Sequence, residues 1–321
     1  MKRGSDMPEV ITIGETMVSM VPKNNGLLRY ENEYKVKIAG AESNVAVGLC
    51  KLNHTVGWIS RLGNDEMGKY ILRQLKSEGV DCQKVVLDRT HRTGLMLKQV
   101  EAQNTQVFYY RENSAASHMI PDHLSESYFD NAKILHLTGI TPVLSESCRK
   151  TIEKAIKIAK KKNILFSFDP NVRKKLWKGK DYSQLLKDLV FQADIVELGI
   201  EEAEYVLGTG KKQEILDILL KNNGQVIVAI KDGEKGAYIG NKNGIIQIEP
   251  YKCNCVETIG AGDAFNAGFL SGILENKDLE TCGKMGAIAG ALATEVRGDI
   301  EGQPDLEKMQ EILSGDSAVY R

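Results

Sequence analysis

The chain has 321 residues, of which 42% are hydrophobic, so it can bury the core of one large α/β domain with a small appendage. Its 42 basic and 43 acidic residues nearly cancel, which argues against nucleic acid or an anionic membrane as the main partner. No apolar run approaches the ~20 residues of a membrane span. Residues 1–8 lack a signal-peptide core, so we expect a cytoplasmic protein that begins with a disordered leader.

Strands and helices alternate along most of the chain, which predicts a parallel sheet covered by helices on both faces. The first strand is apolar and ends in Gly14, and the first helix ends near Asn53, a residue that tolerates the left-handed cap conformation. The predicted strands are 10–14, 56–60, 134–137, 164–168, 195–197, 226–230, 245–248 and 253–256. The predicted helices are 45–52, 69–77, 147–162, 184–191, 201–207, 214–221, 264–274, 279–294 and 306–313.

Two segments interrupt this rhythm and predict a small β-sheet lid. Residues 16–38 alternate in polarity and break repeatedly, as edge or lid strands would. Residues 93–100 and 105–110, within the second lid segment 92–111, alternate on either side of a turn and predict a hairpin. One apolar face of the hairpin would stay partly uncovered, and exposed sheet edges invite pairing, so we expect a lid-mediated homodimer. The residues expected on that face are Leu95, Leu97, Val107 and Tyr109.

The six cysteines form no Cys-x-x-Cys pair, and the five histidines are scattered along the chain. Cys253 and Cys255 could belong to a metal or redox site. On an alternating strand, however, both would point the same way as ordinary small apolar groups, which is the interpretation we favour. A reducing cytosol is the expected compartment.

The stretch 257–263 (Glu-Thr-Ile-Gly-Ala-Gly-Asp) stands between a predicted strand and a predicted helix. Two glycines and an alanine shield the backbone very little, so the first-turn N–H groups of the helix would stay open. Such an end suits a phosphate oxygen or the charge of a phosphoryl transition state. Asp263 could hold the hydroxyl that receives the phosphoryl group, or it could simply cap the helix.

Other polar residues follow predicted strands at the rim where ligands of open α/β sheets bind. The segment 169–173 (Asp-Pro-Asn-Val-Arg) follows one strand, and the segment 199–202 follows another. Arg173 could contribute to an anion site or pair with a surface acid. Arg111, which follows two tyrosines on the hairpin, could be a wall of the same site or be solvated.

Three motifs together resemble the signatures of ribokinase-like (PfkB) carbohydrate kinases. The C-terminal signature is similar to 260–269, and the N-terminal signatures are similar to 39–46 (Ala-Gly-Ala-x-x-Asn-x-Ala) and 62–68 (Leu-Gly-x-Asp-x-x-Gly). The resemblance covers about residues 9–313 in the family's order and spacing. It implies one sugar kinase domain over 9–315, followed by a tail at 316–321. The implied fold is a three-layer α/β/α Rossmann-like domain with a small β-sheet lid.

Within the family, the chain looks most like 2-keto-3-deoxygluconate kinases. The features that carry this likeness are the segment 109–116 (Tyr-Tyr-Arg-x-x-Ser-Ala-Ala), Arg173, Gly199 and 297–302 (Arg-Gly-Asp-Ile-Glu-Gly). Ser19 stands where ribokinases and fructokinases usually place an aspartate that grips sugar hydroxyls. Two residues depart from the pattern: Met96 replaces a lid tyrosine of some such kinases, and Glu257 replaces the aspartate that opens the signature.

The resemblance implies roles for individual residues and two cofactors, ATP and Mg²⁺, with a monovalent cation such as K⁺ left open at Glu257. Asp263 would accept the hydroxyl proton, and Glu202 would position Mg²⁺ through water. The backbone N–H groups of Gly260, Ala261 and Gly262 would form an anion hole for the transferring group. Substrate would contact Gly40, Asn44, Tyr109, Arg111, Asn171, Arg173 and Asp263, and ATP would contact Lys231, Gly233, Gly236, Gly260 and Gly262.

We therefore expect ATP-dependent phosphorylation of 2-keto-3-deoxygluconate to its 6-phosphate. Another sugar kinase of the same fold, acting on fructose, ribose or a related keto acid, stays open as the nearest alternative. A nucleoside kinase is less favoured. From a different class, the chain could be a catalytically silent sugar-binding regulator, although the intact Asp263 argues against silence. Tolerance of the C4 epimer does not follow from the sequence.

Overall fold

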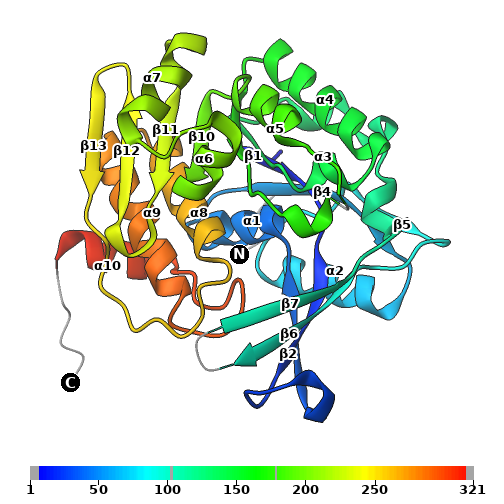
Figure 1. The fold of residues 1–321 in the computed structure, drawn as a ribbon. Helices are drawn as coiled ribbons and strands as arrows, with labels where there is room; N and C mark the ends of the chain where they lie inside the picture. The colour runs from blue at the N-terminus through cyan, green and yellow to red at the C-terminus, as the bar shows by residue number, and fades with distance from the viewer. Residues whose placement is uncertain (1–6, 102–103, 178, 316–321) are drawn as a thin grey trace.

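The computed structural model describes residues 7–101, 104–177 and 179–315, and its centre is a nine-stranded sheet with the order β13-β12-β11-β10-β9-β8-β1-β4-β5 (Figure 1). The seven strands from β11 to β5 are parallel, as predicted. The strands are β1 (Val10–Ile13), β4 (Val56–Gly63), β5 (Val85–Asp88), β8 (Ile134–Thr138), β9 (Leu165–Asp169), β10 (Ile195–Gly199), β11 (Ile227–Lys231), β12 (Ala237–Asn241) and β13 (Gly244–Ile248).

The sheet departs from the prediction at one edge. Strands β12 and β13 pair antiparallel there, and β5 and β12 were not predicted at all. The connection from β11 to β12 holds only the short turn Gly233–Lys235, and a parallel crossover needs a dozen residues or more. The order of short apolar runs could not reveal this reversal.

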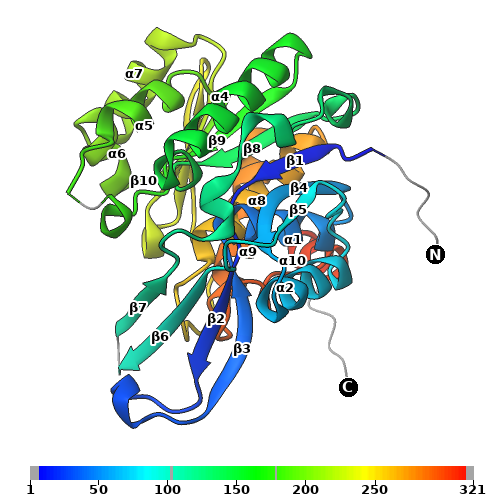
Figure 2. The same ribbon diagram turned by 90° about the vertical axis from the view of Figure 1, so that its right-hand side faces the viewer.

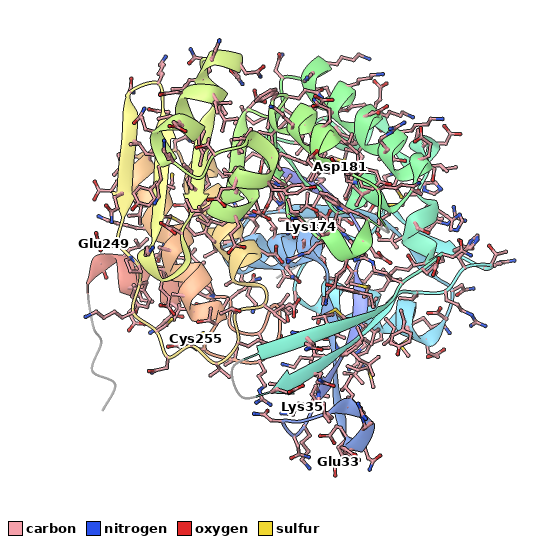
Figure 3. All side chains as sticks on the ribbon, in the orientation of Figure 1. Glu33, Lys35, Lys174, Asp181, Glu249 and Cys255 are labelled. Carbon is pink, nitrogen blue, oxygen red and sulfur yellow. The ribbon has the colours of Figure 1, made fainter. Side chains whose placement is uncertain are left out.

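The predicted strand at 253–256 was wrong. This segment is a loop whose backbone N–H groups at Val256 and Glu257 both donate to the carbonyl of Thr294, at 2.7 and 3.0 Å, instead of forming a ladder. Cys255, labelled in Figure 3, is exposed on this loop, and Cys253 is half-buried, so they are not the buried apolar pair that a strand would have made.

Helices cover both faces of the sheet and complete a three-layer α/β/α fold, which confirms the predicted class (Figures 1 and 2). Helices α3 to α7 pack on one face, α1, α2 and α9 pack on the other, and α8 lies between α1 and α9. The bounds are α1 (Ala41–Lys51), α2 (Glu66–Ser77), α3 (Thr141–Leu144), α4 (Glu146–Lys161), α5 (Ser183–Val190), α6 (Ile200–Leu207), α7 (Lys212–Asn222), α8 (Ala261–Leu274), α9 (Leu279–Ala293) and α10 (Leu306–Ser314).

Alternation along the strands divides the core into two large clusters. On β1, Ile11 and Ile13 belong to the cluster beneath α4 to α7, whereas Val10 belongs to the cluster beneath α1 and α8. Met7 and Pro8, the last two residues of the expected leader, are described: Pro8 is buried, and Met7 packs against the first cluster. The rest of the expected leader and the expected tail lie outside the described residues. Among the described helices, none is long and apolar enough to cross a membrane.

A second sheet of four strands, with the order β3-β2-β6-β7, projects from the main body and forms the predicted lid (Figure 2). Its strands are β2 (Met17–Pro22), β3 (Tyr34–Ala39), β6 (Leu95–Glu101) and β7 (Asn104–Tyr110). The predicted hairpin is β6 and β7, which pair antiparallel, while β2 runs parallel to β6.

The strand register corrects the expected apolar face of the hairpin. Leu95 lies opposite Tyr110 and Leu97 opposite Phe108, so these four residues share one face of the lid. Val107 and Tyr109 lie on the other face, where they pack against a small buried cluster of Met17, Ala39 and Met96. Hence the four residues expected to share one exposed face are divided between two.

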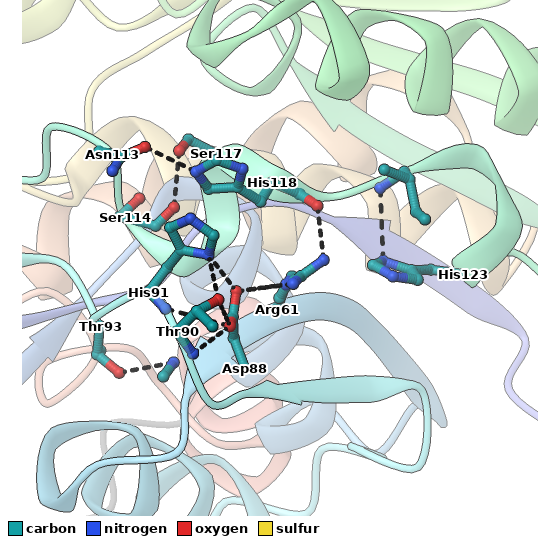
Figure 4. A network of polar contacts seen from close by, with 12 residues as sticks. Arg61, Asp88, Thr90, His91, Thr93, Asn113, Ser114, Ser117, His118 and His123 are labelled. Atoms are coloured by element: carbon teal, nitrogen blue, oxygen red, sulfur yellow. Dashed lines mark hydrogen bonds and ion pairs between the residues drawn. The ribbon is translucent and has the colours of Figure 1, made fainter.

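Polar contacts fasten the two segments through which the chain enters and leaves the hairpin (Figure 4). The rings of His91, before β6, and His118, after β7, stack with centroids 3.6 Å apart. Asp88 accepts from His91 Nδ1 and pairs with Arg61, and Arg61 also donates to the carbonyl of His118. The predicted turn at 62–68 serves the same purpose, because Asp65 caps α2 and accepts from both the backbone N–H and the hydroxyl of Thr93.

Candidate active site

Two adjoining cavities separate the lid from the carboxyl ends of the parallel strands. One has a volume of about 740 Å³ and the other about 80 Å³, and Val107, Tyr109 and Arg173 line both. The smaller cavity holds most of the residues predicted to bind substrate, with Asn171 as the exception. It is lined by Glu15, Met17, Ala39, Gly40, Ala41, Asn44, Met96, Val107, Tyr109, Arg111, Ile140, Arg173, Ile259, Gly260, Asp263 and Asp299.

Asp263 lies in the first turn of α8, buried beside the smaller cavity. Two asparagine amides hold its carboxylate: Asn44 Nδ2 donates to Oδ2 at 2.8 Å, and Asn171 Nδ2 donates to Oδ1 at 3.5 Å. Asn44 comes from α1 and Asn171 from the segment after β9. The Asp263 side chain therefore has a fixed orientation at the end of the sheet.

Burial raises the pKa of Asp263 to about 7. The Asn44 hydrogen bond and the Arg173 guanidinium lower this pKa, while the Asp169 and Asp299 carboxylates raise it further. A carboxylate whose pKa lies near neutrality can both take up and release a proton under ordinary conditions, which general acid–base chemistry requires.

At the start of α8, where an anion site is predicted, two of the three expected backbone donors are open. Gly260 has a φ of 85°, and a Cβ there would lie 2.9 Å from the Asp299 carbonyl, so only glycine fits this turn. The Ala261 N–H donates to the Thr258 carbonyl at 3.3 Å, whereas the N–H groups of Gly260 and Gly262 have no partner among the described residues. The open donors are therefore those of the two glycines.

A buried charged cluster lies next to this helix start. Lys231, the last residue of β11, donates to Asp169 Oδ2 at 2.7 Å and to Asn266 Oδ1 at 3.2 Å. Its Nζ lies 3.6 Å from the position that a Cβ on Gly262 would take. Lys231 is predicted to contact ATP. Its ammonium lies between the Asp169 carboxylate and the glycine-rich turn, outside the described linings of both cavities.

Glu202 lines the larger cavity at the start of α6. Its Oε1 accepts from the Val172 N–H at 2.9 Å and its Oε2 from the Gly199 N–H at 2.8 Å. Burial and the nearby Asp169 carboxylate raise its pKa. Because both oxygens already accept from the backbone, the residue fits water-mediated contact with a cation better than direct ligation. The described residues include no group of three or more His, Cys, Asp or Glu side chains that could hold a metal ion.

The two predicted arginines differ in their partners. Arg111 donates through Nε and Nη2 to Oε2 of Glu15, a buried residue that follows β1. The charge of Arg111 is therefore neutralised within the protein, and Glu15 Oε1 is buried with no hydrogen-bond partner among the described residues. Arg173 has no carboxylate partner in the described parts of the chain and lines both cavities.

The glycines predicted to contact the ligands have different surroundings. A Cβ on Gly40 would lie 2.4 Å from the Glu15 carbonyl oxygen. Gly40 therefore has to be a glycine for the segments that follow β3 and β1 to approach so closely. Gly233 and Gly236 lie in the turn between β11 and β12, at the same end of the sheet as Asp263 but away from the described linings of both cavities.

Four residues of the site were missed by sequence reasoning. Glu15 directly follows the glycine that ends β1, a position that could have indicated a rim residue. Asn266, one turn after Asp263, donates to Asp169 at 2.7 Å. Glu197 and Lys98 gave no signal: a glutamate inside an apolar strand and a lysine in an alternating strand are both usually solvated, yet each is fully buried here.

Comparison with solved structures places this arrangement among sugar kinases with a ribokinase-like fold. A PfkB protein from Polaromonas sp. JS666 superposes with a TM-score of 0.85 at 33% identity, over 94% of this chain and 99% of that chain. The sugar kinase PH1459 from Pyrococcus horikoshii, solved in complex with ATP, superposes with a TM-score of 0.82 at 29% identity, over 93% and 96%.

Residues 7–306 match the model of the pfkB family of carbohydrate kinases, and the chain belongs to that family. A 2-dehydro-3-deoxygluconokinase from Bacillus subtilis (strain 168) is 37% identical over 321 residues, which cover 98% of each chain. The resemblance seen in the sequence motifs is therefore confirmed at the level of the family: this protein is a carbohydrate kinase.

Proposed function

We propose that this carbohydrate kinase transfers the γ-phosphoryl group of ATP to the terminal hydroxyl of 2-keto-3-deoxygluconate, giving the 6-phosphate. The observation that carries the proposal is the position of Arg173, a cation without a carboxylate partner among the described residues. Arg173 lines both cavities, and in the smaller one it shares the wall with Asp263. A sugar acid supplies the carboxylate that such a guanidinium binds best. The Bacillus subtilis relative bears the name of a kinase for the same sugar acid.

In the proposed reaction, Asp263 accepts the proton of the attacking hydroxyl. Asn44 and Asn171 orient its two carboxylate oxygens, so the base points in one direction before substrate binds. Because phosphoryl transfer needs mainly alignment and charge neutralisation, a fixed base beside an anion site is the essential requirement. The N–H groups of Gly260 and Gly262 would receive the charge of the transferring group, with Ala261 contributing little because its N–H already donates to Thr258.

The nucleotide would approach from the side of Lys231. The Lys231 ammonium, beside the glycine-rich turn, would contribute positive charge near the phosphates, and Gly233 and Gly236 would allow close approach of the nucleotide. ATP is the nucleotide in the solved Pyrococcus horikoshii relative. Mg²⁺, when bound, would neutralise the phosphate charge, and Glu202 would hold it through water. We further propose that the protein works in the cytoplasm, which suits a chain whose described cysteines are all free thiols.

Arg111 would hold substrate differently from Arg173. Since Glu15 already neutralises its charge, Arg111 would bind hydroxyl or keto oxygens, and the unpartnered Oε1 of Glu15 would accept from a hydroxyl. Tyr109 and Gly40 would shape the pocket around these groups. This pair would serve a neutral sugar equally well, which keeps a fructokinase or a related keto-sugar kinase as the alternative.

ATP consumption measured against a panel of sugars and sugar acids tests the proposal. We expect 2-keto-3-deoxygluconate to give the highest kcat/KM, well above fructose and ribose. Equal or better use of fructose would overturn the sugar-acid assignment. No phosphorylation of any sugar in the panel, together with tight sugar binding, would instead support the silent regulator.

A further inference from the structure

A fully buried lysine joins the lid to the candidate active site. Lys98 lies on β6, and its side chain is 0% exposed. Its Nζ lies 3.1 Å from Glu257 Oε2 and 2.9 Å from Asp299 Oδ1. Lysine is almost never fully buried unless its charge is paired, and here two carboxylates from different loops pair with one ammonium.

The two carboxylates belong to the loops that shape the anion site. Glu257 opens the turn that leads into α8, and its Oε2 also accepts from the Gly298 N–H at 3.2 Å. Asp299 follows α9, and its backbone lies so close to Gly260 that a Cβ on that glycine would come within 2.9 Å of its carbonyl oxygen. The position of these two loops therefore determines the position of the Gly260 and Gly262 N–H groups.

The same contacts continue to Asp263. Asn44 Nδ2 donates to Asp263 Oδ2 at 2.8 Å and lies 3.4 Å from Asp299 Oδ2, so the order of contacts is Lys98, Asp299, Asn44 and Asp263. Without the ammonium, Glu257 and Asp299 would face each other as buried like charges next to a third carboxylate. Such repulsion in a poorly solvated place would separate the loops or protonate the acids.

We propose that Lys98 is a positioning residue whose ammonium is the internal counter-ion of Glu257 and Asp299. The kinase then needs no added monovalent cation. Once the Lys98 side chain is removed, a small cation can replace its ammonium. The kinetic test of this inference rests on the proposed function. The structural test rests only on the buried contacts of Lys98 with Glu257 and Asp299. The counter-ion role of Lys98 also gives the departure at Glu257 a physical reason, because the longer carboxylate meets a cation that the lid itself supplies. Burial alone would lower the pKa of Lys98, but Asp299 and Glu257 raise it, so the lysine is charged.

The experiment compares wild type with Lys98→Ala, Lys98→Met and Lys98→Arg, and uses Lys35→Met, an exposed lysine on β3 of the same lid, as the matched control. Activity is measured at constant ionic strength in tetramethylammonium, Na⁺, K⁺ and NH₄⁺ chlorides. Wild type, Lys35→Met and Lys98→Arg should show kcat values that change less than about twofold among these salts. Lys98→Met and Lys98→Ala should lose about 10–100-fold in kcat, with smaller changes in KM, since a displacement of about 1 Å has a cost of this order.

Rescue distinguishes positioning from general damage. In Lys98→Ala, K⁺ or NH₄⁺ should restore kcat about fivefold or more in a saturable way, because the vacated volume admits a small cation, whereas tetramethylammonium should not. A wild type that requires K⁺, or a Lys98→Met variant that behaves like Lys35→Met, would overturn the proposal. Loss of activity in Lys98→Ala without rescue by any cation would also count against it.

A second readout separates this inference from the proposed function. Thermal unfolding is followed for wild type and Lys98→Ala in the same salts, without any sugar or nucleotide. K⁺ or NH₄⁺ should raise the Tm of Lys98→Ala relative to tetramethylammonium and leave the Tm of wild type unchanged. If no sugar acid is phosphorylated, the proposed function fails while this Tm comparison still decides the role of Lys98. Equal cation effects on both proteins would contradict it.

Discussion

Asn44 donates its side-chain N–H to Asp263 at 2.8 Å, although the two residues are 219 positions apart in the chain. The contact joins the start of α1, which carries an N-terminal family motif, to the start of α8, which carries the C-terminal one. Two motifs that look independent in the sequence thus meet in a single hydrogen bond. Because Asn171 approaches the other carboxylate oxygen, Asp263 is oriented from two sides. Substitutions of Asp263 and of the residues that orient it therefore test its role in the reaction.

The first prediction concerns Asp263 itself. Asp263→Asn keeps the size and hydrogen-bonding shape of the side chain but cannot accept a proton. We expect ATP binding and the folded state to be retained while kcat falls by about 10²–10⁴, the usual contribution of general-base catalysis. The measurement is steady-state turnover, with nucleotide binding by calorimetry as the control. Near-normal turnover would return Asp263 to the role of a helix-start residue.

The second prediction concerns the pH dependence of kcat/KM. A base must be deprotonated to act, and burial raises the pKa of Asp263 to about 7, so kcat/KM should rise with pH through about pH 7 and then level off. The Asn44 hydrogen bond lowers this pKa. Asn44→Ala should therefore move the acidic limb of the profile to higher pH, in addition to any loss of rate.

The control for this shift is Gln303→Ala. Gln303 donates to the Asn44 backbone carbonyl at 3.2 Å and, among the described residues, makes no hydrogen bond to the Asp263 carboxylate, so its removal should leave the acidic limb in place. An Asn44→Ala profile with its acidic limb unmoved, or moved to lower pH, would show that the limb reports a different group.

The sequence predicted the overall layout well because its signals were local. Glycine next to apolar strands and capping residues such as Asp65 determine where β4 ends and α2 begins, and these are features of neighbouring residues. The placement of Asp263 and the glycines at the start of a helix was predicted for the same reason. These residues belong to one short turn, so their chemical role can be predicted from the local sequence without knowledge of the surrounding structure.

The pairings across the site were not predictable in the same way. That Glu15 neutralises Arg111, and that Lys98 is buried between two acids, depends on how the lid sheet sits over the main sheet. The antiparallel direction of the edge strands β12 and β13 was missed because a short apolar run does not indicate the direction of its neighbour. Burial of a charge is a property of three-dimensional packing, and a lysine among alternating residues gives no sign of it.

The third prediction concerns stability and pH. Glu197 is fully buried on β10, where it accepts from Ser167 Oγ at 2.9 Å, and burial raises its pKa to about 8. The folded state therefore binds more protons than the unfolded state between pH 4.5, the ordinary pKa of a glutamate, and about pH 8, so stability falls as pH rises through this window. Glu197→Gln cannot ionise, and it should lose less stability than wild type over that range.

Between pH 6 and pH 8 the stability of Glu197→Gln relative to wild type should grow by about 2 kcal/mol, which corresponds to about 3 °C in Tm. Asp263 titrates in part of the same window, but it does so in both proteins and cancels in the comparison. Thermal unfolding at several pH values measures the difference. A constant difference in Tm across this pH range would mean that Glu197 does not titrate there.

The fourth prediction concerns the outer face of the lid. Val36, Phe108 and Tyr110 expose 45%, 41% and 63% of their surfaces there, and β7 is an edge strand of the lid sheet. A sheet edge beside exposed apolar groups favours pairing with a second copy, so we expect a lid-mediated dimer. Phe108→Lys should shift the protein toward monomer in sedimentation at micromolar concentration.

The control for the dimer is Ile246→Lys. Ile246 is an apolar residue with 40% of its surface exposed on β13, an edge strand of the main sheet and not of the lid. Ile246→Lys should leave the oligomeric state unchanged. Wild-type protein that sediments only as monomer at micromolar concentration would refute the lid-mediated dimer.

The last prediction concerns the charge of the substrate, and it compares two cations on the same wall. Arg173 has no carboxylate partner in the described parts of the chain, and Lys175 lines the larger cavity two residues further on. A charge-assisted hydrogen bond to a substrate carboxylate contributes about 1.5–3 kcal/mol, or about 10–150-fold in affinity. Arg173→Ala should therefore lower kcat/KM for 2-keto-3-deoxygluconate by about this factor and change it much less for fructose, because fructose has no carboxylate.

The ratio of kcat/KM for 2-keto-3-deoxygluconate to that for fructose should fall in Arg173→Ala and stay as in wild type in the control variant Lys175→Ala. Equal losses for both sugars would show that Arg173 acts on the phosphoryl group or on Asp263, and would leave the kinase assignment standing without its sugar-acid specificity.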